Sequence, residues 1–190
     1  MRASLTLSFA ALVVAGASLV VAADLKSGLQ PGDSVAAFDV EKCGGAVNDN
    51  VKVGSQLCYR CMLGNKPVVM VFARNSDEKL AGLVKELDKA VAKNADQKLS
   101  SFVNLLGKDA DAVKAKAKQF VTKNKVENVA IVVPQDSENG PKQFNINPDA
   151  EVTVVIYREG KVVANHALPA GKLDEKTTAA IISDTSKILK

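Results

Sequence analysis

Apolar residues in this chain follow two different spacings, and their alternation predicts the order of the secondary-structure elements. Val68–Ala73 and Asn128–Val133 are nearly continuous apolar runs, which are typical of strands buried on both faces of a sheet. Ser100–Leu106 has the length and composition of a third strand between them. Helical periodicity separates the strands, and Asp109–Asn124 is the second of two predicted helices. The apolar face of the first helix comprises Leu80, Leu83, Val84, Leu87 and Val91.

The segments on either side of the first core strand have weaker patterns. Ser34–Val40 has the composition of a short strand, whereas Glu41–Gly54 is rich in Gly, Asn and Asp and is expected to be an irregular loop. After the core strand, Asn75 can cap a helix, because Glu78 follows three residues later in a box-like arrangement. The helix is therefore expected to begin at about Ser76.

The last third of the chain predicts a β-hairpin followed by a helix. Pro134–Asp149 is a long polar loop, and Glu151–Leu168 then gives two strands joined by a turn at Glu159–Gly160. Strands that alternate with helices favour an α/β fold, with a mixed, mainly parallel sheet covered by helices on both faces. The C-terminal hairpin adds an antiparallel part. Val68–Ala73 is expected to be a central strand, flanked by the strands at Ser100–Leu106 and Val152–Arg158. The apolar side of the last helix comprises Leu173, Thr177, Ile181, Thr185 and Ile188.

The first residues have the pattern of a secretory signal peptide. Arg2 supplies a positive charge, Leu5–Val21 is apolar, and Val21-Ala22-Ala23 places small residues at the −3 and −1 positions of a cleavage site. The alternative is a membrane anchor, for which the run is short and diluted by Ala, Gly and Ser. Residues 1–23 are thus predicted to be a signal peptide, and residues 24–190 a single exported domain in the periplasm or outside the cell.

Charge and composition exclude one class of partner. The 190-residue chain carries a net charge of only +4, contains no Trp and has its lysines scattered along helical faces. Nucleic-acid binding normally requires a clustered basic surface, so no nucleic-acid partner is expected.

The element order and four segments of the chain resemble the thioredoxin-like superfamily. The segments are "PGDSVAAFDV", "KPVVMVFAR", "VAIVVPQDSENGPKQFNI" and "EVTVVIYREGKVV". The nearest match is the redoxin branch, which includes the peroxiredoxins, and the resemblance covers roughly Gly32 to Leu189. It implies a thioredoxin-like fold.

The chemistry of that family does not carry over at the usual position. The resemblance implies a nucleophilic cysteine in the turn after the first core strand, but Ala73–Leu83 contains no cysteine. Val152 stands where the family has a cis-proline, and the nearest proline is Pro148. Peroxidase or thioredoxin activity is therefore not expected at that position.

The three cysteines leave three interpretations open. Cys58 and Cys61 form a Cys-x-x-Cys pair before the first core strand, and such a pair suits a reducible disulfide that exchanges with other thiols. Met-Leu-Gly-Asn-Lys-Pro follows Cys61 and does not have the composition of a helix start. Alternatively, Cys43 pairs with Cys58 or Cys61 in a structural disulfide, which an exported protein permits. Cys43 is also the candidate resolving cysteine.

The third interpretation is a metal site. Cys43, Cys58 and Cys61 are soft ligands, and His166 is the only histidine that can complete a set for zinc or copper. Apart from such a metal, the chain requires no cofactor.

The most specific functional prediction is thiol–disulfide exchange or redox sensing at Cys58 and Cys61. In that mechanism the more exposed sulfur attacks and the other resolves the mixed disulfide. The expected partners are protein thiols and disulfides. The alternative class is a non-catalytic binding module for another exported protein, with either a structural disulfide or a bound metal.

Overall fold

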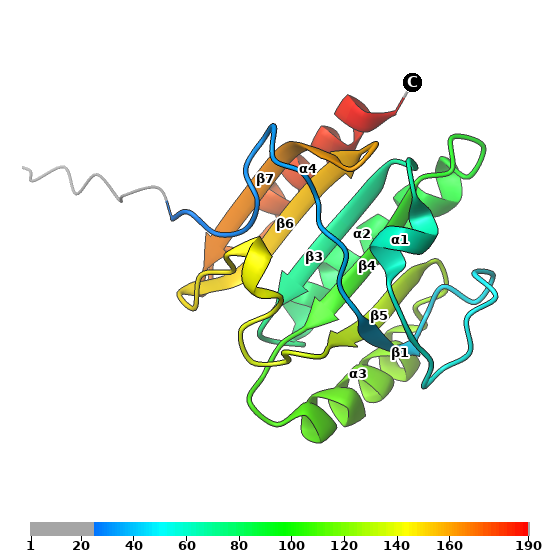
Figure 1. The fold of residues 1–190 in the computed structure, drawn as a ribbon, viewed down its shortest axis with the longest axis vertical. Helices are drawn as coiled ribbons and strands as arrows, with labels where there is room; N and C mark the ends of the chain where they lie inside the picture. Colours follow the sequence, from blue (N-terminus) through cyan, green and yellow to red (C-terminus); the bar gives the residue numbers. More distant parts are fainter. Residues whose placement is uncertain (1–24, 190) are drawn as a thin grey trace, which may run out of the picture.

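A seven-stranded mixed sheet lies at the centre of the molecule, which a computed structural model describes over residues 25–189 (Figure 1). The predicted signal peptide lies outside the described residues. The strand order is β2-β1-β5-β4-β3-β6-β7. The strands are β1 (Val40–Gly44), β2 (Gln56–Leu57), β3 (Val68–Ala73), β4 (Ser100–Leu105), β5 (Val129–Pro134), β6 (Ala150–Arg158) and β7 (Lys161–Pro169).

The helices fall between these strands in the predicted order, with one addition. They are α1 (Tyr59–Leu63), α2 (Glu78–Lys93), α3 (Ala110–Asn124) and α4 (Glu175–Asp184), and two short 3₁₀ turns are η1 (Lys142–Phe144) and η2 (Thr185–Ile188). The addition is α1, which the sequence did not predict. Within residues 25–189, no helix combines the length and the apolar character that a bilayer span requires.

The sheet register confirms the predicted centre of the fold. β3 runs parallel to β4, with Val68 opposite Ser100, and antiparallel to β6, with Ala73 opposite Val152. All six residues of β3 are buried, as expected for a strand covered on both faces. β4 is also parallel to β5, and β6 and β7 form the predicted C-terminal hairpin. The fold class is therefore α/β, as predicted.

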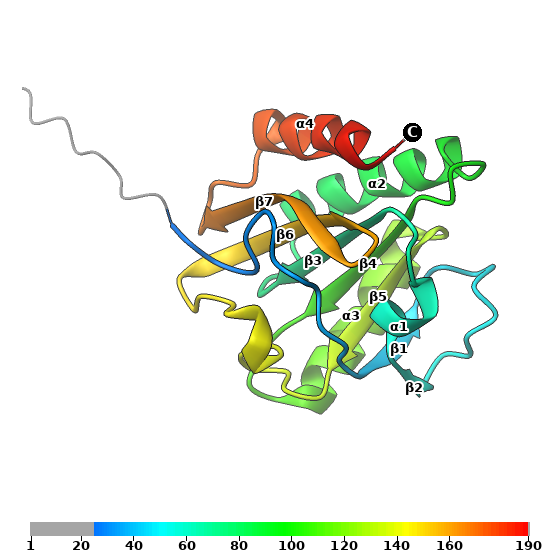
Figure 2. The same ribbon diagram turned by 45° about the horizontal axis from the view of Figure 1, so that its top comes forward.

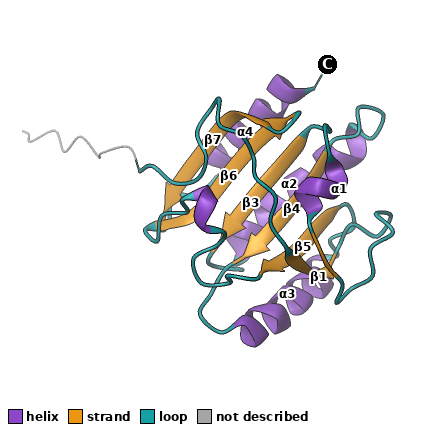
Figure 3. Ribbon diagram, in the orientation of Figure 1, coloured by secondary structure: helices purple, strands orange, loops and turns teal. Residues whose placement is uncertain are grey.

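Two layers cover the faces of the sheet (Figures 2 and 3). Helices α2, α3 and α4 pack on one face of the sheet. Leu83, Phe120 and Ile181 of these helices form one buried cluster with the strand side chains on that face. The opposite face is covered by α1, η1 and the N-terminal segment, where Tyr59 and Phe144 belong to a second buried cluster. The sheet therefore separates two buried clusters, one on each face.

Two predicted boundaries were wrong, and distant residues account for one of them. Asp77 caps α2 by accepting hydrogen bonds from the N–H groups of Lys79 and Leu80, in place of Asn75. The Asn75 amide donates instead to Glu151 Oε2, 3.0 Å away, which no local pattern reveals. In the N-terminal segment, the predicted strand Ser34–Val40 forms only an isolated bridge at Ser34 before β1 begins at its last residue, Val40, and β1 continues to Gly44, within the segment that the sequence predicts to be a loop.

Candidate redox site

Cys58 and Cys61 are joined by a disulfide that spans the first turn of α1. Cys58 is the N-cap residue, and its Sγ accepts a hydrogen bond from the Cys61 backbone N–H at 3.0 Å. Cys61 is exposed and Cys58 is half-buried. No helix starts after Cys61, as expected, but a short helix that the sequence did not predict starts at Tyr59, between the two cysteines.

Long-range contacts of Tyr59 hold this short helix in place. A helix of one turn is not stable by itself in water, so it depends on tertiary packing. The Tyr59 ring stacks on Phe102 of β4, with the ring centroids 5.5 Å apart, and the Tyr59 hydroxyl donates a hydrogen bond to Asp49 Oδ2. Burial and the Asp49 carboxylate hold the pKa of Tyr59 far above its usual range, so the hydroxyl remains a donor. The helix ends at Gly64, whose φ of +57° suits glycine.

A buried ion pair fixes Asp49 and the loop that carries it. Lys42 of β1 is buried, and its Nζ donates to Asp49 Oδ1 at 2.6 Å. The same ammonium donates to the carbonyl oxygens of Ala46 at 3.1 Å and Val51 at 3.0 Å. All three donors of the ammonium therefore have acceptors, which is what a buried charge requires. Sequence analysis missed this network, since nothing near Lys42 marks it as buried.

Arg60, between the two cysteines, anchors α1 from the other side. Its Nε donates to the Val35 carbonyl oxygen at 3.1 Å, and its Nη1 donates to the Gly64 carbonyl oxygen at 3.2 Å. Its Nη2 lies so close to Gly160, in the turn between β6 and β7, that a Cβ there would lie 2.3 Å away. The helix is thus tied to the N-terminal segment and abuts the hairpin.

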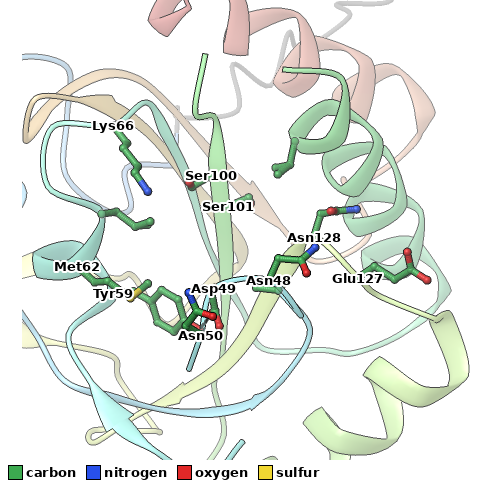
Figure 4. A pocket seen from close by; sticks show the side chains of 13 residues that line it. Asn48, Asp49, Asn50, Tyr59, Met62, Lys66, Ser100, Ser101, Glu127 and Asn128 are labelled. Carbon is green, nitrogen blue, oxygen red and sulfur yellow. Dashed lines mark hydrogen bonds between the residues drawn. The ribbon is translucent and has the colours of Figure 1, made fainter. Parts of the chain in front are cut away.

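A cavity of about 350 Å³ lies next to α1, at the amino ends of β3 and β4 (Figure 4). Tyr59, Met62 and Lys66 line it from the side of α1. Met62 follows Cys61 directly in the sequence and is 42% exposed, whereas neither Cys58 nor Cys61 is among the lining residues. The other side chains labelled in Figure 4 are mostly polar: Asn48, Asp49, Asn50, Ser100, Ser101, Glu127 and Asn128.

Cys43 is a free, buried thiol, so the structure does not contain the predicted structural disulfide through Cys43. The physical reason is its direction. Cys43 belongs to the core on the face of α2, α3 and α4, whereas Tyr59, beside Cys58, packs into the opposite core. Burial, together with the Glu41 carboxylate, raises the pKa of the Cys43 thiol to about 11. The Cys43 thiol is protonated and lies in the core on the other side of the sheet from α1, so it is also poorly suited to resolve a mixed disulfide at Cys58 or Cys61.

His166 does not join the cysteines in a metal site. It lies on β7, at one edge of the sheet, and its Nε2 is 3.1 Å from Asp184 Oδ2. β1 and β2, which precede α1, lie at the opposite edge. Among residues 25–189, no group of three His, Cys, Asp or Glu side chains is placed to hold a metal ion. The zinc or copper set predicted from Cys43, Cys58, Cys61 and His166 is therefore not assembled.

Known proteins resemble this chain in fold, whereas comparison by sequence finds none. No protein-family model matches this sequence, and neither does any curated protein sequence. Among solved structures, the chain is similar to a thiol:disulfide interchange protein from Bacteroides sp., with a TM-score of 0.59 and 14% identity over 85% of this chain and 91% of that chain. It is similar to Mycobacterium tuberculosis AhpC, with a TM-score of 0.59 and 13% identity over 84% of this chain and 93% of that one.

A third similar structure is a secreted Mycobacterium tuberculosis disulfide oxidoreductase homologous to E. coli DsbE, with a TM-score of 0.52 and 14% identity over 77% of this chain and 95% of that chain. The chain therefore has the thioredoxin-like fold, as the resemblance in its sequence implied. These identities are low, and the similarity is one of fold. What the chain does must be argued from its own site.

Proposed function

We propose that this protein carries out thiol–disulfide exchange with other proteins through Cys58 and Cys61. The observation that carries the proposal is the arrangement of the pair: a disulfide at an exposed helix turn, with one sulfur accepting a backbone N–H. Cys61 is exposed, and the Cys61 N–H points to Cys58 Sγ at 3.0 Å. A hydrogen bond to sulfur stabilises a thiolate and so favours its departure or its formation.

The two sulfurs then have different roles. A substrate thiolate attacks Cys61 Sγ, a mixed disulfide forms, and Cys58 leaves as a thiolate that the Cys61 N–H stabilises. A second substrate thiolate then attacks the substrate sulfur of that mixed disulfide, and Cys61 leaves as a thiolate. The substrate is oxidised to a disulfide by two electrons, and the protein is left as a dithiol. The reverse sequence reduces a substrate disulfide, with Cys61 attacking and Cys58 resolving.

The surroundings of the pair support a polypeptide substrate. The cavity beside α1 is lined mainly by amide, hydroxyl and charged side chains, which can pair with the backbone of an extended peptide. Residues 1–23 are proposed to direct the chain out of the cytoplasm, leaving residues 24–190 as the working domain. A disulfide is compatible with that destination.

The test combines an exchange assay with equilibrium against glutathione. The wild-type protein should oxidise a dithiol peptide, and its pair should have a reduction potential above about −300 mV, the range of exchanging disulfides. Cys61→Ser should be inactive. Cys58→Ser, treated with the intermolecular disulfide of a single-cysteine peptide, should accumulate a mixed disulfide on Cys61 and release one peptide thiol, because no resolving sulfur remains; the product is detectable as an added peptide mass.

Cys43→Ser provides the matched control and should retain activity, since Cys43 lies in the opposite core. A potential below about −300 mV, with no exchange by the wild-type protein, would instead identify a structural disulfide in a non-catalytic binding module. A mixed disulfide trapped on Cys58 in Cys61→Ser, with none on Cys61 in Cys58→Ser, would reverse the assigned roles.

A further inference from the structure

A second cavity, of about 360 Å³, lies at the carboxyl ends of β3 and β4, at the opposite end of β3 from the disulfide. The end of β3 and the turn after it (residues 73–76), the end of β4 and the loop after it (residues 105–109), and the first turns of α3 line this cavity. Its volume is within the range of small-molecule sites.

Arg74 lines this cavity with hydrogen-bonding capacity that the protein does not use. Its Nη1 donates to the Glu138 carbonyl oxygen at 2.8 Å, but its Nε and Nη2 are buried and have no hydrogen-bond partner. No carboxylate of residues 25–189 forms an ion pair with Arg74. Buried polar groups in folded proteins nearly always have partners. The Nε and Nη2 of Arg74 therefore keep hydrogen-bonding capacity that the described protein does not use.

Two lysines add positive charge at the same place. Lys108 and Lys116 line the cavity, both are exposed, and neither forms an ion pair with any residue of the described chain. Asp109 is the one carboxylate among the lining residues, and its Oδ1 already accepts the N–H groups of Asp111 and Ala112 at the start of α3, each at 3.0 Å. The lining residues of the cavity therefore carry more positive than negative charge. The one lining carboxylate, that of Asp109, already accepts hydrogen bonds from the start of α3.

The wall of the cavity is held in place before any ligand arrives. The Gly107 N–H donates to the Ser137 carbonyl oxygen at 2.6 Å, and the Ser137 hydroxyl donates back to the Gly107 carbonyl oxygen at 3.0 Å. Arg74 is bonded to the neighbouring residue, Glu138. The segments that follow β3, β4 and β5 are thus joined around the cavity, which lowers the cost of ordering it on binding.

We propose that this cavity binds a small organic anion through a carboxylate or phosphate group. The guanidinium of Arg74 is the main contact, because its planar fork matches either group with two parallel hydrogen bonds. Lys108 and Lys116 attract the anion at the rim. This site is distinct from the redox pair, and its occupancy requires no change in Cys58 or Cys61.

Titration calorimetry with two probes tests the site at constant ionic strength, using the protein with its disulfide intact. Inorganic phosphate represents phosphate esters and succinate represents organic acids. Saturable one-site binding of phosphate alone assigns a phosphate-bearing ligand, and of succinate alone a carboxylate-bearing one. Binding of both supports a site for either oxyanion. No saturable heat from either probe, beyond that of sodium chloride, overturns the proposal.

Variants locate the binding. Arg74→Lys keeps the charge but removes the planar fork, and should weaken binding by about 10- to 100-fold, the effect of losing one hydrogen bond to a charged group. The exposed pair of changes Lys108→Gln and Lys116→Gln should also weaken binding, and decides the matter if Arg74→Lys does not fold. Lys93→Gln, in the last turn of α2, is the control and should bind as the wild type does. Unchanged affinity in the double variant, or in a folded Arg74→Lys, contradicts the site.

Discussion

The two ends of β3 differ in what they contain, although the same strand supports both. At the amino end, α1 places the Cys58–Cys61 disulfide beside a cavity, and the polar groups of Lys42 and Asp49 beneath it are paired. At the carboxyl end, where the redoxin family has its cysteine, the turn contains no sulfur, and Arg74 has two buried nitrogens without partners. The two ends of the strand therefore differ both in sulfur content and in how their buried polar groups are paired.

This difference also separates two kinds of polar group. The Lys42 ammonium has three acceptors within the protein, so these contacts account fully for its burial and stabilise the loop that carries Asp49. Arg74 has one acceptor for Nη1 and none for its other two nitrogens, so its burial is explained by structure only in part. A buried cation whose donors all have acceptors, such as Lys42, is explained by its structural role. Unpaired buried donors, such as those of Arg74, call for a further explanation.

The largest expected effect concerns the position of the chemistry. Cys61→Ser should reduce thiol–disulfide exchange to the background rate, because the attacked sulfur is gone. Ser76→Ala, at the carboxyl end of β3 where the family's cysteine would lie, should leave the rate unchanged. The measurement is the initial rate of dithiol-peptide oxidation. A loss of activity in Ser76→Ala with full activity in Cys61→Ser would instead place the exchange chemistry at the carboxyl end of β3.

The next effect is on stability. Lys42→Met should lower the free energy of unfolding by about 3–5 kcal/mol, because it leaves the Asp49 carboxylate buried without its partner. Arg74→Met should change it by only about 1 kcal/mol, because the one lost hydrogen bond is offset by removing two unpaired donors. Urea unfolding of both variants measures the difference. Equal losses would show that the two cations do the same structural work.

A smaller effect separates the two tyrosines near the amino end of β3. Tyr59→Phe should cost about 1.5–3 kcal/mol, because its hydroxyl donates to the Asp49 carboxylate. The Tyr157 hydroxyl is buried without a partner, so Tyr157→Phe should be neutral or stabilising. Thermal and urea unfolding of both variants provide the test. A larger loss in Tyr157→Phe than in Tyr59→Phe would disprove the assigned hydrogen bonding.

The smallest effect is a dependence on pH at Cys43. Burial raises the pKa of the Cys43 thiol from the ordinary value of 9.0 to about 11, so the folded state binds more protons than the unfolded state between these values. The thiol's contribution to stability is therefore present below pH 9 and lost as the pH rises towards 11. The wild type should lose stability relative to Cys43→Ala between pH 8.5 and pH 10. A constant difference across that range would contradict the raised pKa.

The sequence by itself determined the order of elements, the central place of β3 and the C-terminal hairpin. These follow from continuous apolar runs, which indicate strands buried on both faces, and from apolar positions three to four residues apart, which indicate helices buried on one face. It also showed that the turn after β3 lacks a cysteine, since that is a matter of residue identity. The Cys58–Cys61 pair was visible for the same reason.

Only the tertiary structure decided how those cysteines are used. Helix α1 begins at Cys58 because Tyr59 stacks on Phe102 and bonds to Asp49, and neither partner belongs to the local sequence pattern. Cys43, in β1, faces the other core, which sets it apart from the pair. The cluster of positive charge around Arg74 likewise comes from loops after different strands. Such contacts join residues that are far apart along the chain, and periodicity carries no information about which of them meet.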